Sequence, residues 1–169
     1  MSAMDIGKAV RRRVRATRKW LIFRLINFWP PYLGSGIKVR TLDMAKGVVE
    51  VELGLHWWNR NYVGTQYGGS LYSMCDPFYM LILIENLGPR FIVWDKSGVV
   101  RFRKPGRGTV RARFEITPEE IERIRETAMR DGKAEPVFVA KVIDDDGQVV
   151  AEVEKLVHVK RDKSKKKRD

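Results

Sequence analysis

The chain has 169 residues, the size of one ordinary domain with a terminal appendage, and its 44% of hydrophobic residues is enough for a packed core. A single cysteine excludes an internal disulfide framework, and two histidines are too few for a multi-histidine metal site. Residues 1–24 carry eight basic residues against one acidic, residues 160–169 carry seven against two, and residues 25–159 carry 18 of each. The net charge of +12 therefore belongs to the two ends, and the neutral middle argues against specific nucleic-acid recognition.

The first predicted element is an amphipathic helix over residues 8–29, where apolar residues recur at spacings of three, four and seven between arginines. Pro30 and Pro31 are expected to end this helix. It either packs its apolar stripe on the domain or contacts a membrane surface, since basic residues mixed with Trp20 and Trp29 are typical of interfacial helices.

The next stretch alternates apolar and polar residues with a period of two. This pattern predicts strands over residues 37–41 and 49–55, with a hairpin turn at 45–47. Residues 57–69 are polar and contain glycines, which indicates a loop. Residues 70–86 are apolar almost all round, so we expect a buried helix there.

The second half of the chain is predicted to be mostly strand. Alternating patterns predict four strands, over residues 91–103, 110–116, 136–143 and 149–159. A helix over 118–130 separates the second of these strands from the third. It starts with a threonine cap at Thr117, followed by proline and two glutamates.

This order of elements predicts an α+β protein. A long apolar helix in a mainly antiparallel protein must be covered on several sides, and a curved antiparallel sheet wrapped around the helix does this. That is the architecture of the hotdog fold, here with an extra N-terminal helix. We expect a basic amphipathic helix over residues 1–32, a hotdog domain over 33–159 and a disordered basic tail over 160–169.

The sequence also predicts the oligomeric state and the cellular location of the protein. Sheet edges and helix surface left uncovered by one such sheet predict a homodimer or homotetramer. The longest strongly apolar run, residues 77–84, is far shorter than the about 20 residues of a membrane span. No secretory signal is visible, so we expect a cytoplasmic protein.

Two features of the loop and the buried helix indicate chemistry. Gly68 and Gly69 lie where the loop enters the helix, so free N–H groups without a nearby Cβ are open to a ligand. Asp76 lies on an otherwise apolar helix, where an ionised carboxylate is costly unless it is paired or functional. The structural alternatives are turn glycines and an aspartate paired with a nearby tyrosine or backbone amide.

These residues form part of a longer pattern, an asparagine, a tyrosine-glycine-glycine run and an aspartate, at Asn61, Tyr67, Gly68, Gly69 and Asp76. The pattern resembles the motif of the hotdog-fold acyl-CoA thioesterases, especially the phenylacetate-pathway and four-helix-type group. Within that group the chain resembles the DUF4442 branch, a domain of unknown function. It departs from the motif at Tyr67, where histidine is common, and at Pro77, which is expected to bend the helix just after the aspartate.

The resemblance implies hydrolysis of an acyl-CoA thioester without a cofactor or metal. The carbonyl oxygen would accept from the N–H of Gly68, with Gly69 beside it. Asp76, presented from the partner subunit of a dimer, would activate water or attack directly as a nucleophile. Asn61 would orient the water or the thioester, or would merely tie the loop together. Tyr67 would donate a hydrogen bond without acting as a base.

Further candidates for substrate binding are weaker. Thr65 belongs to the same loop, and Ser97 falls near the place where some relatives have a further catalytic serine or threonine. Arg103 and Arg107 flank a turn and would hold the phosphates of CoA, or would simply be solvated charges at a strand edge. Cys75 is expected to be a small buried apolar residue, not a nucleophile.

Two other functions compete with the thioesterase. The first is an acyl-CoA or acyl-chain binding protein that has kept the fold without efficient hydrolysis, which the changes at Tyr67 and Pro77 would allow. The second is binding to a nucleic acid or a membrane surface through the basic ends. A hotdog dehydratase is disfavoured, because neither His56 nor His158 lies in the glycine-helix motif.

Overall fold

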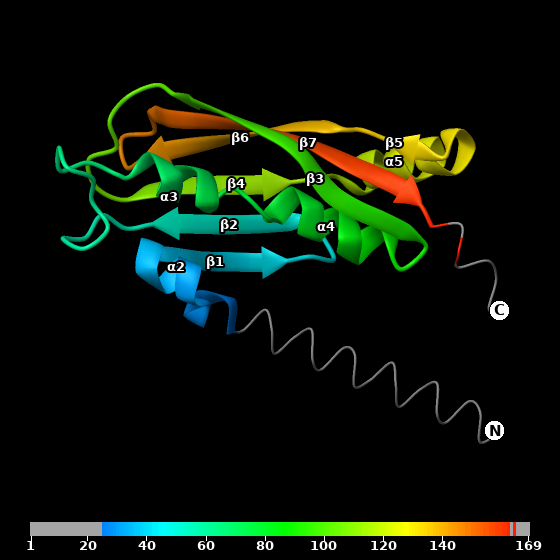
Figure 1. Ribbon diagram of the computed structural model, residues 1–169, viewed down its shortest axis with the longest axis horizontal. Coiled ribbons are helices and arrows are strands. Elements are labelled where there is room, and N and C mark those ends of the chain that lie inside the picture. The colour runs from blue at the N-terminus through cyan, green and yellow to red at the C-terminus, as the bar shows by residue number, and fades with distance from the viewer. Residues whose placement is uncertain (1–24, 163, 165–169) are drawn as a thin grey trace, which may run out of the picture.

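A curved antiparallel sheet forms the body of the molecule (Figure 1). The structure is a computed structural model that describes residues 25–162 and 164. The sheet order is β1-β2-β4-β6-β7-β3, and the two-residue strand β5 pairs with β7. The strands are β1 (Ile37–Asp43), β2 (Val48–Leu53), β3 (Phe91–Phe102), β4 (Val110–Glu115), β5 (Lys133–Ala134), β6 (Val137–Asp144) and β7 (Val149–Arg161).

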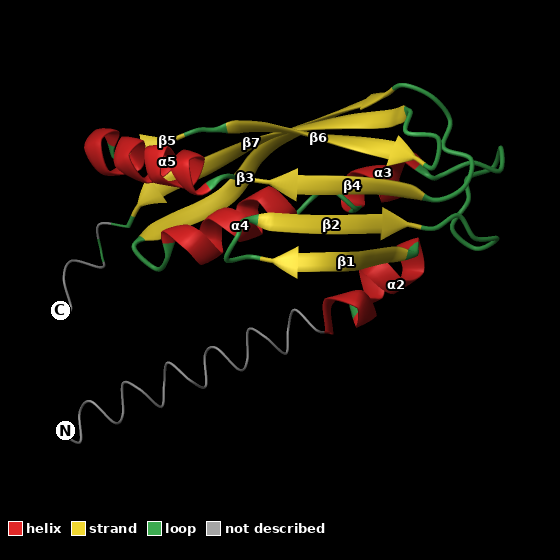
Figure 2. Ribbon diagram, turned by 180° about the vertical axis from the view of Figure 1, so that it is seen from behind, coloured by secondary structure: helices red, strands yellow, loops and turns green. Residues whose placement is uncertain are grey.

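Short helices lie along the sheet. They are η1 (Ile26–Phe28), α2 (Pro30–Ser35), α3 (Gly68–Ser73), α4 (Phe78–Leu87) and α5 (Pro118–Asp131). Figures 1 and 2 show α3 and α4 following one another along the sheet, and α5 at the end of the molecule opposite α3. Phe78, Ile82 and Leu83 of α4 are fully buried against the inward-facing side chains of the strands. This arrangement is the hotdog fold that the order of predicted elements indicated.

The central helix differs from the prediction, because it consists of two pieces. α3 ends at Ser73 and α4 begins at Phe78, with Pro77 as its N-cap residue. Proline has no N–H to donate to the preceding turn, and its ring disfavours helical geometry in the residue before it. The expected bend after Asp76 is thus a break, and the aspartate lies within the break.

The N-terminal prediction is partly outside the described residues and partly wrong. Residues 8–24 of the expected helix are not described, and the described part contains the short 3₁₀ turn η1. Pro30 and Pro31 do not end a helix but begin α2, since proline has the right φ for a first helical turn and loses no hydrogen bond there.

The other predicted elements are confirmed within a few residues of their expected ends. The hairpin of β1 and β2 turns at residues 44–47, and Gly47 has a positive φ of 69°. The Oγ1 atom of Thr117 accepts a hydrogen bond from the N–H of Glu120 at 3.2 Å and caps α5 as expected. The pattern missed β5, because two residues are too few to show a period.

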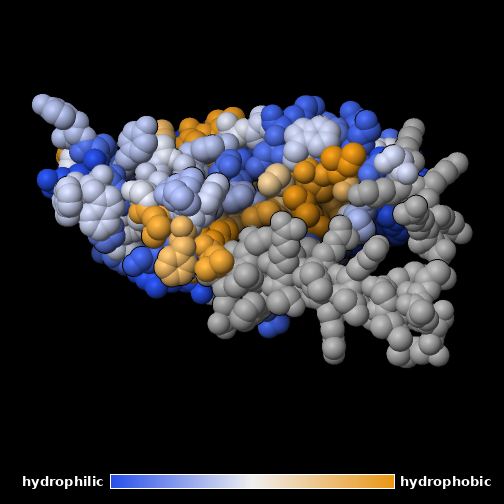
Figure 3. Space-filling view, turned by 60° about the horizontal axis from the view of Figure 1, so that its bottom comes forward, coloured by the Kyte–Doolittle hydropathy of each residue, from blue (hydrophilic) through white to orange (hydrophobic). Residues whose placement is uncertain are grey.

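The outer surface has a hydrophobic side. Figure 3 brings the side of α2, β1 and α4 forward and shows hydrophobic surface between hydrophilic regions. Leu25, Phe28, Trp29 and Leu33, which belong to η1, α2 or the residues that flank them, each expose about half or more of their surface. Within the described part of the chain, no helix has the length and apolar character needed to cross a membrane.

Candidate functional site

The loop before α3 is held closed by Asn61. The side-chain amide of Asn61 donates to Oγ1 of Thr65 at 2.9 Å and to the carbonyl of Gln66 at 3.3 Å. Its Oδ1 atom accepts from the N–H groups of Val63 and Thr65. Both polar atoms of the amide are therefore engaged inside the loop, and Thr65 is buried beneath it. This geometry matches the loop-tying role that the sequence left open for Asn61.

The two glycines at the start of α3 lie under aromatic rings. A Cβ on Gly69 would lie 2.4 Å from the ring of Tyr67, and a Cβ on Gly68 would lie 3.0 Å from the ring of Phe102 on β3. Neither glycine has a positive φ, so turn geometry does not require them. The carbonyl of Tyr67 accepts the N–H groups of Ser70 and Leu71, the first helical bonds after the glycines.

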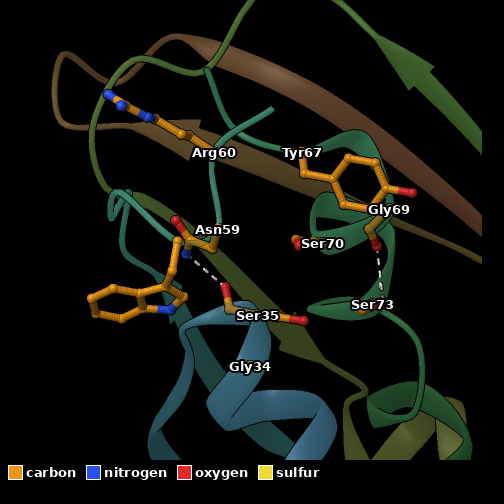
Figure 4. A pocket seen from close by; sticks show the side chains of 9 residues that line it. Gly34, Ser35, Asn59, Arg60, Tyr67, Gly69, Ser70 and Ser73 are labelled. Carbon is orange, nitrogen blue, oxygen red and sulfur yellow. Dashed lines mark hydrogen bonds between the residues drawn. The ribbon is translucent and has the colours of Figure 1, made fainter. Parts of the chain in front are cut away.

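A polar cavity of about 540 Å³ opens between the end of α2, residues 58–60 and the first turn of α3 (Figure 4). The cavity is lined by Gly34, Ser35, Trp58, Asn59, Arg60, Tyr67, Gly69, Ser70 and Ser73. Its wall is tied together by the amide of Asn59, which donates to the carbonyl of Ser35 at 2.8 Å. Of the predicted site residues, Tyr67 and Gly69 line this cavity, whereas Asp76 does not.

Asp76 lies in a different cluster, between α3 and the strands β3 and β7. Its Oδ1 atom is 2.8 Å from Nζ of Lys155, and the same ammonium is 2.8 Å from Oδ2 of Asp95. The side chain of Lys155 is 1% exposed, that of Asp95 19% and that of Asp76 51%. The hydroxyl of Tyr72 accepts a further hydrogen bond from Lys155 at 3.1 Å. The site thus has one carboxylate open to solvent and one mostly buried.

The charge states in this cluster follow from burial and pairing. Burial alone would lower the pKa of Lys155, but its hydrogen bonds to Asp76, Asp95 and Tyr72 raise that pKa above the ordinary value of lysine. Burial raises the pKa of Asp95, although the ammonium of Lys155 opposes the shift. Oδ1 of Asp95 is buried and has no hydrogen-bond partner among the described residues. Lys155 is therefore a permanent cation near neutral pH.

Lys155 lies outside the motif, but the sequence contains a separate signal for it. Lys155 stands in the period-two pattern of β7 between Val153 and Val157, both of them fully buried. A lysine at an inward-facing position of an apolar strand face is unusual unless a carboxylate pairs with it. The inward position of Asp95 on β3 is visible in the same way, through Phe91 and Val93.

Cys75 is buried beside this cluster. Burial raises the pKa of its thiol to about 12, so the thiolate is not populated near neutral pH. The thiol is therefore the inert small side chain that the sequence predicted.

The remaining predicted binding residues, Ser97, Arg103 and Arg107, are exposed at the surface. Arg103 is exposed and hydrogen-bonds the carboxylate of Glu152 at 2.5 Å, so a phosphate would have to compete with that partner. Arg107 is exposed and makes no ion pair within residues 25–162. Ser97 is exposed on β3, directly after the irregularity that separates it from Asp95.

Within the described chain, no group of three or more histidine, cysteine, aspartate or glutamate side chains could hold a metal ion.

Comparison with known proteins places the chain among proteins of the same fold. The DUF4442 family model, described as a domain of unknown function, matches residues 18–159. A protein of unknown function from Pseudomonas aeruginosa, described as a probable thioesterase, is 26% identical, with a TM-score of 0.74 over 85% of this chain and 96% of that one. No protein with a curated function matches this chain in sequence.

More distant structures share the fold. A protein of unknown function from Chlorobaculum tepidum is 17% identical, with a TM-score of 0.67 over 85% of this chain and 94% of that one. A thioesterase from Staphylococcus aureus, solved as a mutant, is 18% identical, with a TM-score of 0.55 over 75% of this chain and 94% of that one.

Proposed function

Because the chain belongs to the DUF4442 family and has the hotdog fold, we propose that it is an acyl-CoA thioesterase, which hydrolyses an acyl-CoA thioester to a free acid and CoA. The similarity to a Pseudomonas aeruginosa protein described as a probable thioesterase supports the reaction class. The observation that carries the proposal is Asp76. A carboxylate in a helix break, half exposed and fixed by an ion pair, can act on a substrate.

The chemistry follows from this carboxylate and from the glycines. Asp76 takes a proton from a water molecule, and the oxygen of that water forms a bond to the thioester carbonyl carbon. The carbonyl oxygen, which becomes an oxyanion, accepts from the N–H groups of Gly68 and Gly69. When the carbon–sulfur bond breaks, the CoA thiolate leaves and takes the proton that Asp76 had removed. Asn61 contributes by holding the loop that carries these glycines.

The catalytic site requires two copies of the chain. Asp76 and the cavity that contains Gly69 form separate groups within one protomer. The outer edge of β3 pairs with no other described strand, and Ile92, Trp94 and Val99 on this strand are exposed. A homodimer formed along this edge would cover these side chains and bring Asp76 of one protomer to the glycines of its partner.

The substrate lies across both groups in this proposal. The cavity beside Tyr67 and Gly69 accepts a part of the acyl-CoA, with Arg60 and Trp58 in its wall. The exposed Arg103 and Arg107 are available to the CoA phosphates, Arg103 only if it leaves Glu152.

Thiol release from acyl-CoAs of short, medium and long chain tests this function. We expect wild-type turnover with at least one chain length and a fall of about 100-fold in Asp76→Asn, the scale of losing a general base. Asp131→Asn is the matched control, since Asp131 is an exposed aspartate at the end of α5 and its variant should keep wild-type turnover.

Two outcomes would contradict the proposal. Equal turnover in wild type and Asp76→Asn would remove Asp76 from the reaction. Saturable acyl-CoA binding without thiol release in either protein would favour the alternative function, an acyl-CoA binding protein without efficient hydrolysis. The changes at Tyr67 and Pro77 allow this alternative.

A further inference from the structure

Lys155 is a buried cation on an apolar strand face. It projects from β7 toward the central helices, between the fully buried Val153 and Val157, and its side chain is 1% exposed. Desolvating an ammonium ion is costly, and a buried lysine is retained in a fold when carboxylates compensate for the lost water. Two carboxylates, on Asp76 and Asp95, do so here.

Every donor of this ammonium has a partner. The three N–H groups of a lysine ammonium match the three acceptors present, which are Asp76 and Asp95 at 2.8 Å each and the hydroxyl of Tyr72 at 3.1 Å. No donor is left to reach a substrate oxygen. Lys155 therefore acts through its partners and does not contact the reacting atoms.

The strand beside Lys155 leaves space for this arrangement. Gly98 lies opposite Lys155 in the pairing of β3 with β7, and a Cβ at Gly98 would lie 2.5 Å from the hydroxyl of Tyr72. The irregularity in β3 between Asp95 and Ser97 shifts the register just before this position. A glycine and a register shift thus surround the contact, as is common where a strand has to aim a side chain.

The two carboxylates differ in what they can do. Asp95 keeps 19% of its side chain exposed and is held on a strand, so it anchors the ammonium from the interior. Asp76 is 51% exposed and lies in the break between α3 and α4, where no continuous helix fixes its direction. The ammonium of Lys155 is the contact that connects this carboxylate to the sheet, through β7.

We propose that Lys155 is a positioning residue that, anchored by Asp95 and Tyr72, holds the Asp76 carboxylate in its reactive orientation. This inference rests on the proposed function for its effect on turnover, although the contact itself can be tested without any substrate. Lys155 binds Oδ1 of Asp76, and no described residue hydrogen-bonds Oδ2, so this second oxygen is the one that can accept a proton from water. Asp95 sets the place of the ammonium and does not touch the substrate.

The first test measures turnover in Lys155→Met, which keeps an unbranched side chain one atom shorter than lysine and removes the charge. We expect turnover to fall about tenfold or more, and Lys155→Met/Asp76→Asn to be no slower than Asp76→Asn alone, because the two residues act as one unit. Wild-type turnover in a folded Lys155→Met would overturn the proposal. Additive losses in the double variant would also overturn it.

A second variant covers the case in which Lys155→Met does not fold. Lys155→Met/Asp95→Asn removes the cation together with the more buried carboxylate, so no unpaired charge remains in the interior. We expect this protein to fold and to keep the loss of turnover. Full turnover in this variant would show that Asp76 needs no ammonium, and the proposal would fail.

Chemical rescue separates positioning from a merely structural role. Lys155→Ala leaves space for a small amine, and added propylammonium should restore part of the lost turnover whereas propanol at the same concentration should not. Rescue by both compounds would mean that filling the space is enough, and rescue by neither would mean that the charge at this point is not what Asp76 needs. Either result would contradict the proposal.

A last measurement stands apart from the thioesterase activity. A lysine ammonium locked by three hydrogen bonds gives an observable ¹H–¹⁵N resonance in the wild-type protein, and Asp76→Asn should shift or broaden it. If wild-type turnover is absent but this resonance responds, the proposed function fails while the contact stands. If no lysine ammonium signal responds to Asp76→Asn, the positioning role is overturned.

Discussion

The glycine under the ring of Tyr67 makes the sharpest test at the level of single residues. A Cβ at Gly69 would lie 2.4 Å from that ring, so Gly69→Ala must push Tyr67 away from the start of α3. Tyr67 is more than half exposed and can move, so we expect the fold to survive. Because Tyr67 directly precedes the two glycines, its movement should shift the N–H groups of Gly68 and Gly69. We expect turnover to fall about tenfold or more, since small misplacements in a site are costly. Thiol release and thermal unfolding measure the two effects.

Gly34→Ala is the matched control for that variant. Gly34 lines the same cavity, lies in α2 and has no atom within 4 Å of a Cβ built on it. An alanine there should raise the free energy of unfolding by about 0.4–1 kcal/mol, because it lowers the entropy of the unfolded chain. Equal turnover in the two variants would show that the start of α3 has no special role.

The break between α3 and α4 matters at the level of secondary structure. Pro77→Ala restores an N–H that can continue the helix, and a continuous helix would rotate Asp76 away from Lys155. We expect turnover to fall about tenfold, since the carboxylate leaves its position, while the free energy of unfolding changes little. Activity assays and circular dichroism check the two parts.

The helix α5 provides the control for the proline. Pro118 is the first residue of α5 and directly follows the N-cap residue Thr117, far from Asp76 along the chain. Pro118→Ala should leave turnover unchanged, because the first turn of a helix does not use the missing N–H. A loss in Pro118→Ala equal to that in Pro77→Ala would mean that general destabilisation, and not the break, explains the effect.

At the level of the whole molecule, the proposed dimer predicts complementation between two defective proteins. If Asp76 and Gly69 of one site come from different protomers, a mixed dimer of Asp76→Asn and Gly69→Ala contains one intact site and one doubly defective site. Random mixing should therefore restore about a quarter of wild-type turnover. Refolding the two variants together and measuring thiol release tests this, and turnover equal to the mean of the two separate variants would contradict a shared site.

Much of the fold could be predicted because its signals are local. The alternation in β1 and β2, the threonine cap of α5 and the apolar stretch of the central helix each show themselves within a few consecutive residues. The same holds for the glycine pair and Asp76, which a short motif connects. The predicted role of the two prolines at the start of α2 is wrong, because proline both ends helices and begins them, and the local sequence does not distinguish the two cases.

The order of the elements and the residues of the motif are therefore properties that local patterns predict. The contacts of those residues depend on the tertiary structure. Lys155 lies 79 residues after Asp76 in the chain, and Arg103, directly after β3, hydrogen-bonds Glu152 on β7. Such pairs depend on strand register and on where the helix breaks, and no local pattern contains either. The buried lysine was visible as an anomaly in β7, but its carboxylate partners became visible only once the sheet had brought β3, β7 and the helix break together.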